Sequence, residues 1–425
     1  MKVSFISLLT GVCFAIGLVA QSQPADLINL DETKVAPYIL PDVLKTANGK
    51  VIKNSAQWNT IQRPAILSLY QKYVYGKMPG KTPGTHYKVK SVNDTALGNR
   101  AVSKQVTIFF TADTSGPQMD LLLYLPKNAK AKVPVFIGLN FYGNQSTTTD
   151  PGISVTNNWV NNNSAAVANH HAGDSSRGLQ AARWPAAMLI EAGYGLATAY
   201  YGDLEPDFAT GYRSGIRTAL SQTLGLQPEE WSAIGAWAWG LSRMLDYLET
   251  DKAVDGKKVI VTGHSRIGKA ALWAGASDTR FAAVVSNNSG EGGAALSKRN
   301  FGETILRINT SFPHWFVPAF TSFNNNAAAL PVDQHMLLSL VAPRPLYVAS
   351  AADDLWADPR GEFLAASAAT PVYHLFNKKG IDSKKMPPVN TPVGHSVQYH
   401  RRTGKHDITA YDWEQYIRFA DRFFK

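Results

Sequence analysis

The sequence is almost without cysteine, because its 425 residues contain only Cys13. Cys13 lies in an apolar run that follows Lys2 and extends to Ala20, which is the layout of a secretory signal peptide. We expect cleavage near Ala20, so that residues 1–20 are removed and the mature protein has neither disulfides nor thiol chemistry. An exported protein without disulfides is typical of a bacterial periplasm or exterior. We therefore predict a secreted or periplasmic bacterial protein.

Three other features are lacking. Polar sequence follows the N-terminal run at once, which argues against a membrane anchor. The net charge is +10, yet Lys and Arg are spread along the chain without a basic run, and no nucleic-acid-binding motif is present. The charge therefore indicates either a solvated cationic surface or an acidic polysaccharide partner. No His-Glu-x-x-His or comparable ligand spacing occurs, so we predict neither a metal nor another cofactor.

The most informative stretch spans residues 257–268 and reads KKVIVTGHSRIG. Apolar β-forming residues run into Gly263, Ser265 and Gly268, and a helix-forming run, KAALWAGAS, follows. This pattern predicts a strand, a tight turn and a helix, which together expose the Ser265 hydroxyl as the nucleophile elbow of α/β-hydrolases. Gly268 lies one residue later than the usual pattern requires. The alternative is an ordinary turn with a helix-capping serine.

Segments of strand and helix character alternate along the rest of the chain. The predicted strands are 106–110, 119–125, 133–141, 194–201, 281–286, 344–350 and 371–376, and the predicted helices are 58–76, 180–192, 228–251, 330–340 and 410–424. Such alternation is typical of a parallel sheet with right-handed crossovers. We predict an α/β-hydrolase fold, a three-layer sandwich with a mostly parallel central sheet, as a single domain over residues 21–425. The polar segment 147–179 is too long for a simple connection and is predicted to be a loop insertion.

A serine nucleophile requires a base, and the base requires an acid that fixes its tautomer. In α/β-hydrolases these groups follow in the order serine, acid, histidine. Three histidines come after the last predicted strand, namely His395, His400 and His406. We favour His406, because it lies in a glycine-containing loop directly before the final helix and can reach back over the sheet. His395 is the second candidate.

The acid has three candidates. The usual place is the end of a strand after the elbow, and the strand that ends near Ser350 is followed by Asp353 and Asp354. We favour Asp354 and place Asp353 next. Glu291, at the end of the preceding strand, is the rival, and one of these carboxylates could simply cap a turn.

Two cations follow the nucleophile. The backbone N–H of Arg266 would face a developing oxyanion, and its guanidinium could add positive charge. Lys269 lies one helical turn beyond Ser265 on the same face, which favours a polar or charged substrate over an apolar ester. The alternative is that both are ordinary exposed residues at a helix start.

Five stretches stand out as motifs: GHSRIGKAALW, SNNSGEGGAALSKRNFGET, DQH at 333–335, VAPRPLYVASAADDLWADPRGEF and GKHDITAYDW. Together they resemble the glucuronoyl esterases, family fifteen of the carbohydrate esterases, over most of the chain from about Val133 onward. The resemblance implies hydrolysis, without a metal, of the ester between 4-O-methyl-D-glucuronic acid of glucuronoxylan and lignin alcohols. By position it implies that the nucleophile, base and oxyanion residue are Ser265, His406 and Arg266, and that the residues holding the uronate ring are Lys269, Glu303 and Trp356.

One position departs from the fungal members of this family. They carry the triad acid as a glutamate just before the Ser-Gly of the SGxGG stretch, where this sequence has Asn288. Other bacterial members resemble this chain in having an aspartate at the place of Asp354. The resemblance therefore favours Asp354 over Glu291, which lies three residues too late.

Two other functions remain as alternatives. The first is an acetyl xylan esterase or another carbohydrate esterase, which would use the same serine chemistry on a smaller acyl group. The second is a carbohydrate-binding protein that has kept the fold and lost the chemistry. For the favoured function we expect a monomer whose partner is the glucuronoxylan and lignin-carbohydrate ester substrate.

Overall fold

The computed structural model describes residues 28–162 and 166–425, so the predicted signal peptide and Cys13 lie outside the described residues. The strands are β1 (His86–Thr95), β2 (Ala101–Phe109), β3 (Gln118–Pro126), β4 (Val133–Asn140), β5 (Val167–Ala168), β6 (His171–Ala172), β7 (Gly195–Tyr200), β8 (Val254–His264), β9 (Ala283–Asn287), β10 (Leu346–Ala351), β11 (Val393–Gly394) and β12 (Val397–Arg402). The helices are α1 (Ser55–Gln57), α2 (Arg63–Tyr73), α3 (Ala96–Asn99), α4 (Ala186–Glu191), α5 (Ile216–Ala219), α6 (Ser221–Leu224), α7 (Ala233–Leu248), α8 (Arg266–Ser277), α9 (Ile305–Ser311), α10 (Gln334–Ser339), α11 (Pro359–His374) and α12 (Ala410–Phe424).

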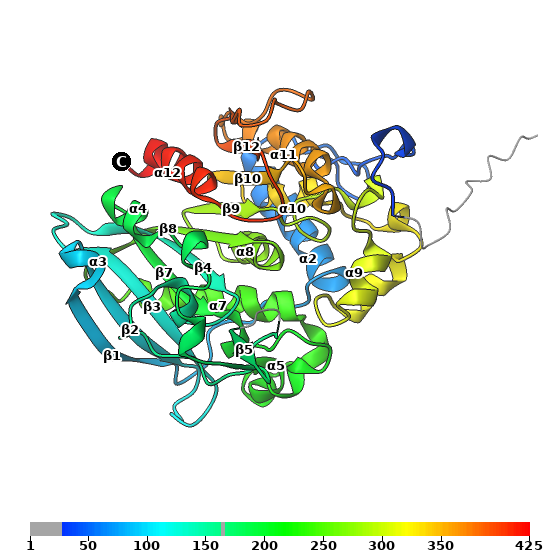
Figure 1. Cartoon of the computed structure of the whole chain (residues 1–425). Coiled ribbons are helices and arrows are strands. Elements are labelled where there is room, and N and C mark those ends of the chain that lie inside the picture. Colours follow the sequence, from blue (N-terminus) through cyan, green and yellow to red (C-terminus); the bar gives the residue numbers. More distant parts are fainter. Residues whose placement is uncertain (1–27, 163–165) are drawn as a thin grey trace, which may run out of the picture.

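One sheet organises the molecule (Figure 1). Its strand order is β1-β2-β3-β7-β4-β8-β9-β10-β12-β11. Neighbouring strands from β7 to β12 run parallel, whereas β1, β2 and β3 pair antiparallel at one edge and β11 pairs antiparallel at the other. Parallel neighbours place their carboxyl ends at the same edge of the sheet. Segments that are distant in sequence therefore meet at that edge.

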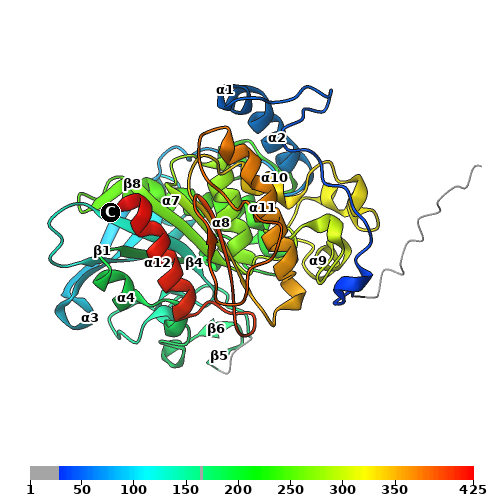
Figure 2. The same ribbon diagram turned by 90° about the horizontal axis from the view of Figure 1, so that it is seen from above.

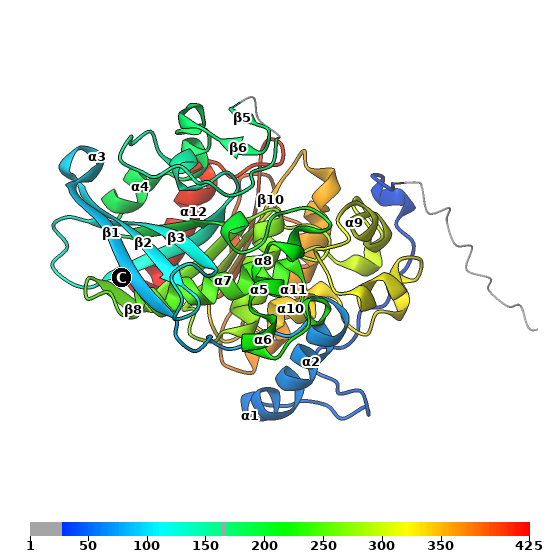
Figure 3. The same cartoon turned by 90° about the horizontal axis from the view of Figure 1, so that it is seen from below.

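Helices cover both faces of this sheet, and the side chains of each strand alternate between them. In β8, Val259 and Val261 join the large apolar cluster with α7 and α8, whereas Ile260 joins the cluster with α4 and α12. Figure 2 shows α4 and α12 near each other, and Figure 3 shows α8, α10 and α11 grouped together. The predicted three-layer α/β arrangement with a mostly parallel sheet is confirmed.

The predicted insertion at 147–179 contains the two-stranded β5–β6 sheet, which Figures 2 and 3 show at the rim of the molecule. Within the described ranges, no helix has the length and apolar character needed to cross a membrane.

Two predicted elements differ from the structure. Residues 371–376 were predicted as a strand, but Pro371 lies inside α11, whose preceding turns are rich in alanine, a strong helix former. The strand beside β10 is instead β12, whose sequence VQYHRR is too polar to be recognised as buried. The helix predicted at 180–192 begins only at Ala186, because Pro185 interrupts it.

Candidate active site

The turn between β8 and α8 has the geometry of a nucleophile elbow. Ser265 has φ 58° and ψ −130°, a conformation that is costly for any residue other than glycine. Its backbone N–H donates to the carbonyl of Asn287 over 2.9 Å, which ties the turn to the end of β9. The Ser265 side chain is therefore presented at the carboxyl edge of the parallel strands.

The late second glycine has a steric explanation. A Cβ at Gly263 would lie 2.2 Å from the carbonyl oxygen of Ile267, and a Cβ at Gly268 would lie 3.0 Å from the Cβ of Ser289. Position 268 thus faces the segment after β9, whereas Ile267 is fully buried in the core. Glycine is required where the backbone approaches its neighbour, and in this chain that place is one residue later than usual.

His406 lies in the loop between β12 and α12 and is hydrogen-bonded to Asp354 in the turn that follows β10. The distance from His406 Nδ1 to Asp354 Oδ2 is 2.6 Å. The imidazole ring lies 4.5 Å from that of His264, the residue before Ser265. Because a carboxylate accepts the Nδ1 proton, Nε2 is the nitrogen that can accept a second proton. Within the described part of the chain no hydrogen bond involves the Ser265 hydroxyl, and such bonds are often long before substrate binds.

The other candidate acids lie elsewhere. Glu291 is buried, its carboxylate accepts the Ser297 hydroxyl over 2.6 Å, and burial raises its pKa to about 8. Asp353 is exposed. Asn288, at the position of the fungal glutamate, donates a hydrogen bond from Nδ2 to the carbonyl of Asp407 over 3.5 Å. Asp354 is thus the candidate acid that the structure places on His406.

The other candidate histidines have separate surroundings. His400 is fully buried in β12, where Nε2 lies 2.9 Å from Asp412 and Nδ1 lies 2.8 Å from the Tyr347 hydroxyl. His395 packs its ring 5.5 Å from that of Phe423. Both side chains have partners that stabilise the fold away from Ser265.

Arg266 is held by a carboxylate and by aromatic rings. Its NH1 pairs with Asp207, and its guanidinium carbon lies 4.8 Å from the ring centre of Trp315. Burial acts to lower the pKa of Arg266, but the charge of Asp207 outweighs it and raises that pKa above the ordinary value. The buried Nε–H has no acceptor among the described residues. Arg266 therefore remains charged and retains an unused donor.

Lys269 and Glu303 form the buried polar side of the site. Lys269 Nζ donates to the carbonyl of Ser289 over 2.5 Å, and burial lowers its pKa while Glu303 opposes that shift. Burial raises the pKa of Glu303, and the charge of Lys269 and the indole of Trp356 oppose that change. The Glu303 N–H donates to the carbonyl of Trp356 over 2.9 Å, and Trp356 remains 40% exposed. These three predicted residues therefore lie together.

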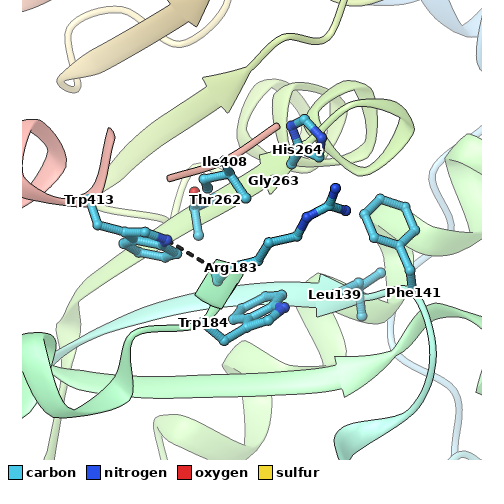
Figure 4. A pocket seen from close by; sticks show the side chains of 9 residues that line it. All are labelled: Leu139, Phe141, Arg183, Trp184, Thr262, Gly263, His264, Ile408 and Trp413. Carbon is cyan, nitrogen blue, oxygen red and sulfur yellow. Dashed lines mark hydrogen bonds between the residues drawn. The ribbon is translucent and has the colours of Figure 1, made fainter. Parts of the chain in front are cut away.

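A small cavity lies directly behind the elbow (Figure 4). Its lining includes His264, Arg183 and Trp413, and its volume of about 20 Å³ is sufficient for roughly one water molecule. Arg183 Nε pairs with Asp407 Oδ1 at 2.6 Å, and Trp413 Nε1 donates to the Arg183 carbonyl over 2.9 Å. The Arg183–Asp407 pair therefore links the segment after the 147–179 insertion to the residue next to His406.

Sequence reasoning missed two side chains at this site, Asp207 and Trp315. Both contact Arg266, and Trp315 also lies 5.5 Å from Lys269 Nζ. The available signal for Asp207 was its place in the segment after a strand of the parallel sheet, where functional side chains gather.

Among the described residues, His, Asp and Glu side chains form no group of three or more that could hold a metal ion.

Comparisons with known proteins show which proteins this chain resembles. A family model described as glucuronyl esterase, fungi, matches residues 223–377. Carbohydrate esterase MZ0003, from an unknown prokaryotic organism, is 49% identical over 397 residues, which cover 92% of this chain and 91% of that protein. A 4-O-methyl-glucuronoyl methylesterase of Wolfiporia cocos is 39% identical over 151 residues, covering 33% of this chain and 37% of the relative.

Solved structures extend the similarity to nearly the whole chain. A glucuronoyl esterase from Solibacter usitatus has a TM-score of 0.88 and 49% identity, and the match covers 93% of this chain and 100% of that one. A promiscuous CE15 esterase from a marine bacterial metagenome has a TM-score of 0.86 and 47% identity over 93% and 99% of the two chains. A glucuronoyl esterase domain from Hypocrea jecorina, at 19% identity and a TM-score of 0.60, shares the fold.

Proposed function

Because the chain belongs to carbohydrate esterase family fifteen, the glucuronoyl esterases, we propose that it hydrolyses the ester between 4-O-methyl-D-glucuronic acid of glucuronoxylan and lignin alcohols. The observation that carries the proposal is the 2.6 Å hydrogen bond between His406 and Asp354 beside the Ser265 elbow. It supports a Ser265-His406-Asp354 triad. The mature enzyme would act outside the cytoplasm, and we expect a monomer.

The reaction would proceed in two steps through an acyl-enzyme. His406 Nε2 removes the hydroxyl proton as Ser265 Oγ attacks the uronate carboxyl carbon. Asp354 stabilises the resulting imidazolium, which then donates its proton to the departing alcohol. Water, deprotonated by the same His406, attacks the acyl carbon, and the imidazolium returns that proton to Ser265 Oγ as the acyl bond breaks, which releases glucuronate and the free serine.

Arg266 would stabilise the negative oxygen that develops in both steps. The support is its retained charge and its buried Nε–H, which has no acceptor among the described residues. A donor already held in a site of low dielectric stabilises a developing oxyanion without reorganising during the reaction. Removal of one such donor commonly lowers kcat by about 10²–10³-fold in serine hydrolases.

Lys269, Glu303 and Trp356 would bind the sugar. Lys269 and Glu303 present a buried donor and a buried acceptor to ring hydroxyls, and the exposed indole of Trp356 offers an apolar face next to them. Buried polar groups discriminate strongly, because a ligand lacking the matching hydroxyls leaves them without partners. This arrangement favours a uronate over a simple acetyl group.

The decisive experiment compares hydrolysis of benzyl glucuronate and an aryl acetate by the wild type and Ser265→Ala. We expect turnover of the glucuronate ester by the wild type and its loss in the variant. Turnover of acetate alone would indicate an acetyl esterase. Binding of glucuronoxylan by both proteins without any turnover would indicate a carbohydrate-binding protein.

A further inference from the structure

One buried carboxylate outside the predicted triad, that of Asp207, gathers donors from several parts of the chain around Arg266. His314 Nε2 and Trp315 Nε1 each lie 2.7 Å from Asp207 Oδ1. Arg266 NH1 pairs with Oδ2, which also accepts the Tyr201 hydroxyl over 3.2 Å. The side chain of Asp207 is 1% exposed, so water does not compete for these bonds.

The arrangement fixes the direction of the carboxylate. Asp207 Oδ1 accepts hydrogen bonds from the ring N–H groups of two buried side chains, His314 and Trp315. These bonds direct Oδ2 toward Arg266. Burial acts to raise the pKa of Asp207, but the hydrogen bond from His314 and the charge of Arg266 outweigh it and hold that pKa below the ordinary value. The group is therefore a carboxylate throughout the neutral range. A charge-assisted pair of this kind is strong and directional.

Trp315 constrains Arg266 a second time. The edge of its indole donates to Asp207, while the guanidinium carbon of Arg266 lies 4.8 Å from the ring centre. Cation–π stacking fixes the plane of a guanidinium, and the ion pair fixes its rotation within that plane. With NH1 used by Asp207, the free Nε–H of Arg266 has a defined direction.

We propose that Asp207 is a positioning residue, which holds Arg266 in the orientation from which it stabilises the oxyanion. This inference rests on the proposed function, since it gives Asp207 a part in the same reaction. Asp207 acts through Arg266 and touches neither substrate nor Ser265 in this scheme. Catalytic donors must be held close to the productive geometry, because small displacements cost much of their effect.

The test is a double-mutant cycle between positions 207 and 266, with benzyl glucuronate as substrate. Asp207→Asn keeps the size of the side chain and an oxygen for His314 and Trp315, but turns an amide toward Arg266. We expect kcat to fall about tenfold or more with little change in KM, since the lost interaction acts in the transition state. In an Arg266→Ala background the same substitution should cost less than about twofold.

Glu205→Gln is the matched control. Glu205 lies two residues earlier in the same segment, is fully buried and pairs with Arg217 at 2.6 Å. Its replacement removes a buried ion pair and should lower Tm, but any effect on kcat should be the same fold-change with Arg266 present or absent. Equal losses from Asp207→Asn in the two backgrounds would mean a structural role and would overturn the inference.

A second variant covers the case in which Asp207→Asn does not fold. Trp315→Phe keeps an aromatic ring beneath Arg266 and removes only the indole N–H that directs Asp207. It should lower kcat in the wild-type background and have little effect in Arg266→Ala, and equal effects would again overturn the inference. Absence of turnover of any ester by the wild type would overturn the proposed function and this inference together.

Discussion

At the residue scale, Asp354 supplies the negative charge that would stabilise an imidazolium at His406. Asp354→Asn keeps the size of the side chain but removes the charge that fixes the tautomer and stabilises the protonated ring. We expect kcat on benzyl glucuronate to fall about 10³–10⁴-fold, as in serine proteases with the equivalent change. Steady-state kinetics measure the loss. Asp353→Asn is the control and should stay near wild type, whereas a small loss in Asp354→Asn would return the role to Glu291.

The sugar-binding role of Lys269 predicts a loss that depends on the substrate. Lys269→Met keeps the apolar stem, which is buried, and removes the ammonium group beside Glu303. We expect KM for benzyl glucuronate to rise about tenfold, since one hydrogen bond to a charged group is worth roughly 1.5–3 kcal/mol. The kcat/KM for an aryl acetate should be unchanged, which also checks folding. An equal loss on both substrates would contradict the role in sugar binding.

Predictability at this scale depends on whether a residue belongs to a local motif. The sequence indicates Ser265 and His406 as candidates, because each lies in a short pattern with a fixed place relative to a strand or helix. For Asp207 the sequence offers only a place after a parallel strand, because the contacts that distinguish this residue are with His314 and Trp315, more than a hundred positions away. The predicted family, fold class and enzyme class are confirmed by a relative 49% identical over 92% of the chain.

At the element scale, burial explains which strands could be predicted. β4, β8 and β10 carry apolar residues on both faces, so they appear in the sequence as continuous apolar runs. β12 is equally buried but carries Gln398, His400 and Arg402, each paired with a tertiary partner. Polar residues that are satisfied only by tertiary contacts leave no periodic signal in the sequence.

One of those polar residues, Arg402, anchors the loop that carries His406. Arg402 NH2 donates to the carbonyls of Lys405 and Asp407 over 2.9 and 2.6 Å, and Arg402 Nε donates to Asp412 over 2.8 Å. A lysine has a single donor centre and cannot make these bonds together. We expect Arg402→Lys to lower kcat about tenfold through a less ordered loop, a smaller effect than loss of a catalytic group.

Matched measurements would separate this effect from general destabilisation. Arg401→Lys, at the neighbouring and more exposed position, should retain wild-type kcat. Limited proteolysis should cut Arg402→Lys within residues 403–409 faster than the control. Unchanged kcat in Arg402→Lys would show that Asp354 alone is sufficient to hold His406.

At the scale of the whole molecule, buried carboxyl groups link folding to proton uptake. Burial raises the pKa of Glu362 and of Glu291 to about 8, and that of Asp333 to about 6. Between pH 5 and their raised pKa values these groups hold protons in the folded protein that the unfolded chain has released. Their contribution to the free energy of unfolding should therefore fall as pH rises toward pH 8, and level off above it.

Glu362→Gln tests this linkage with little structural change. Glu362 Oε1 accepts the N–H groups of Ser289 and Gly290 at 2.8 and 3.0 Å, and its Oε2 lies 2.6 Å from the Ser350 hydroxyl. A glutamine can accept the same two N–H bonds and donate to Ser350, so it imitates the protonated acid. The variant should lose part of the downward slope between pH 5 and pH 8, on the order of 1 kcal/mol per pH unit at most.

Urea unfolding at a series of pH values measures that slope, and Asp412→Asn provides a control of opposite sign. Burial acts to raise the pKa of Asp412, but its bonds with His400 and Arg402 hold that pKa below 3.8. Its contribution is present at neutral pH and is lost as pH falls below 3.8, so Asp412→Asn should lower the free energy of unfolding at neutral pH and alter the pH slope only on the acid limb. If Glu362→Gln left the slope between pH 5 and pH 8 unchanged, Glu362 would be ionised in the folded protein. Its charge would then be stabilised by the backbone N–H groups of Ser289 and Gly290, in the turn beside the elbow.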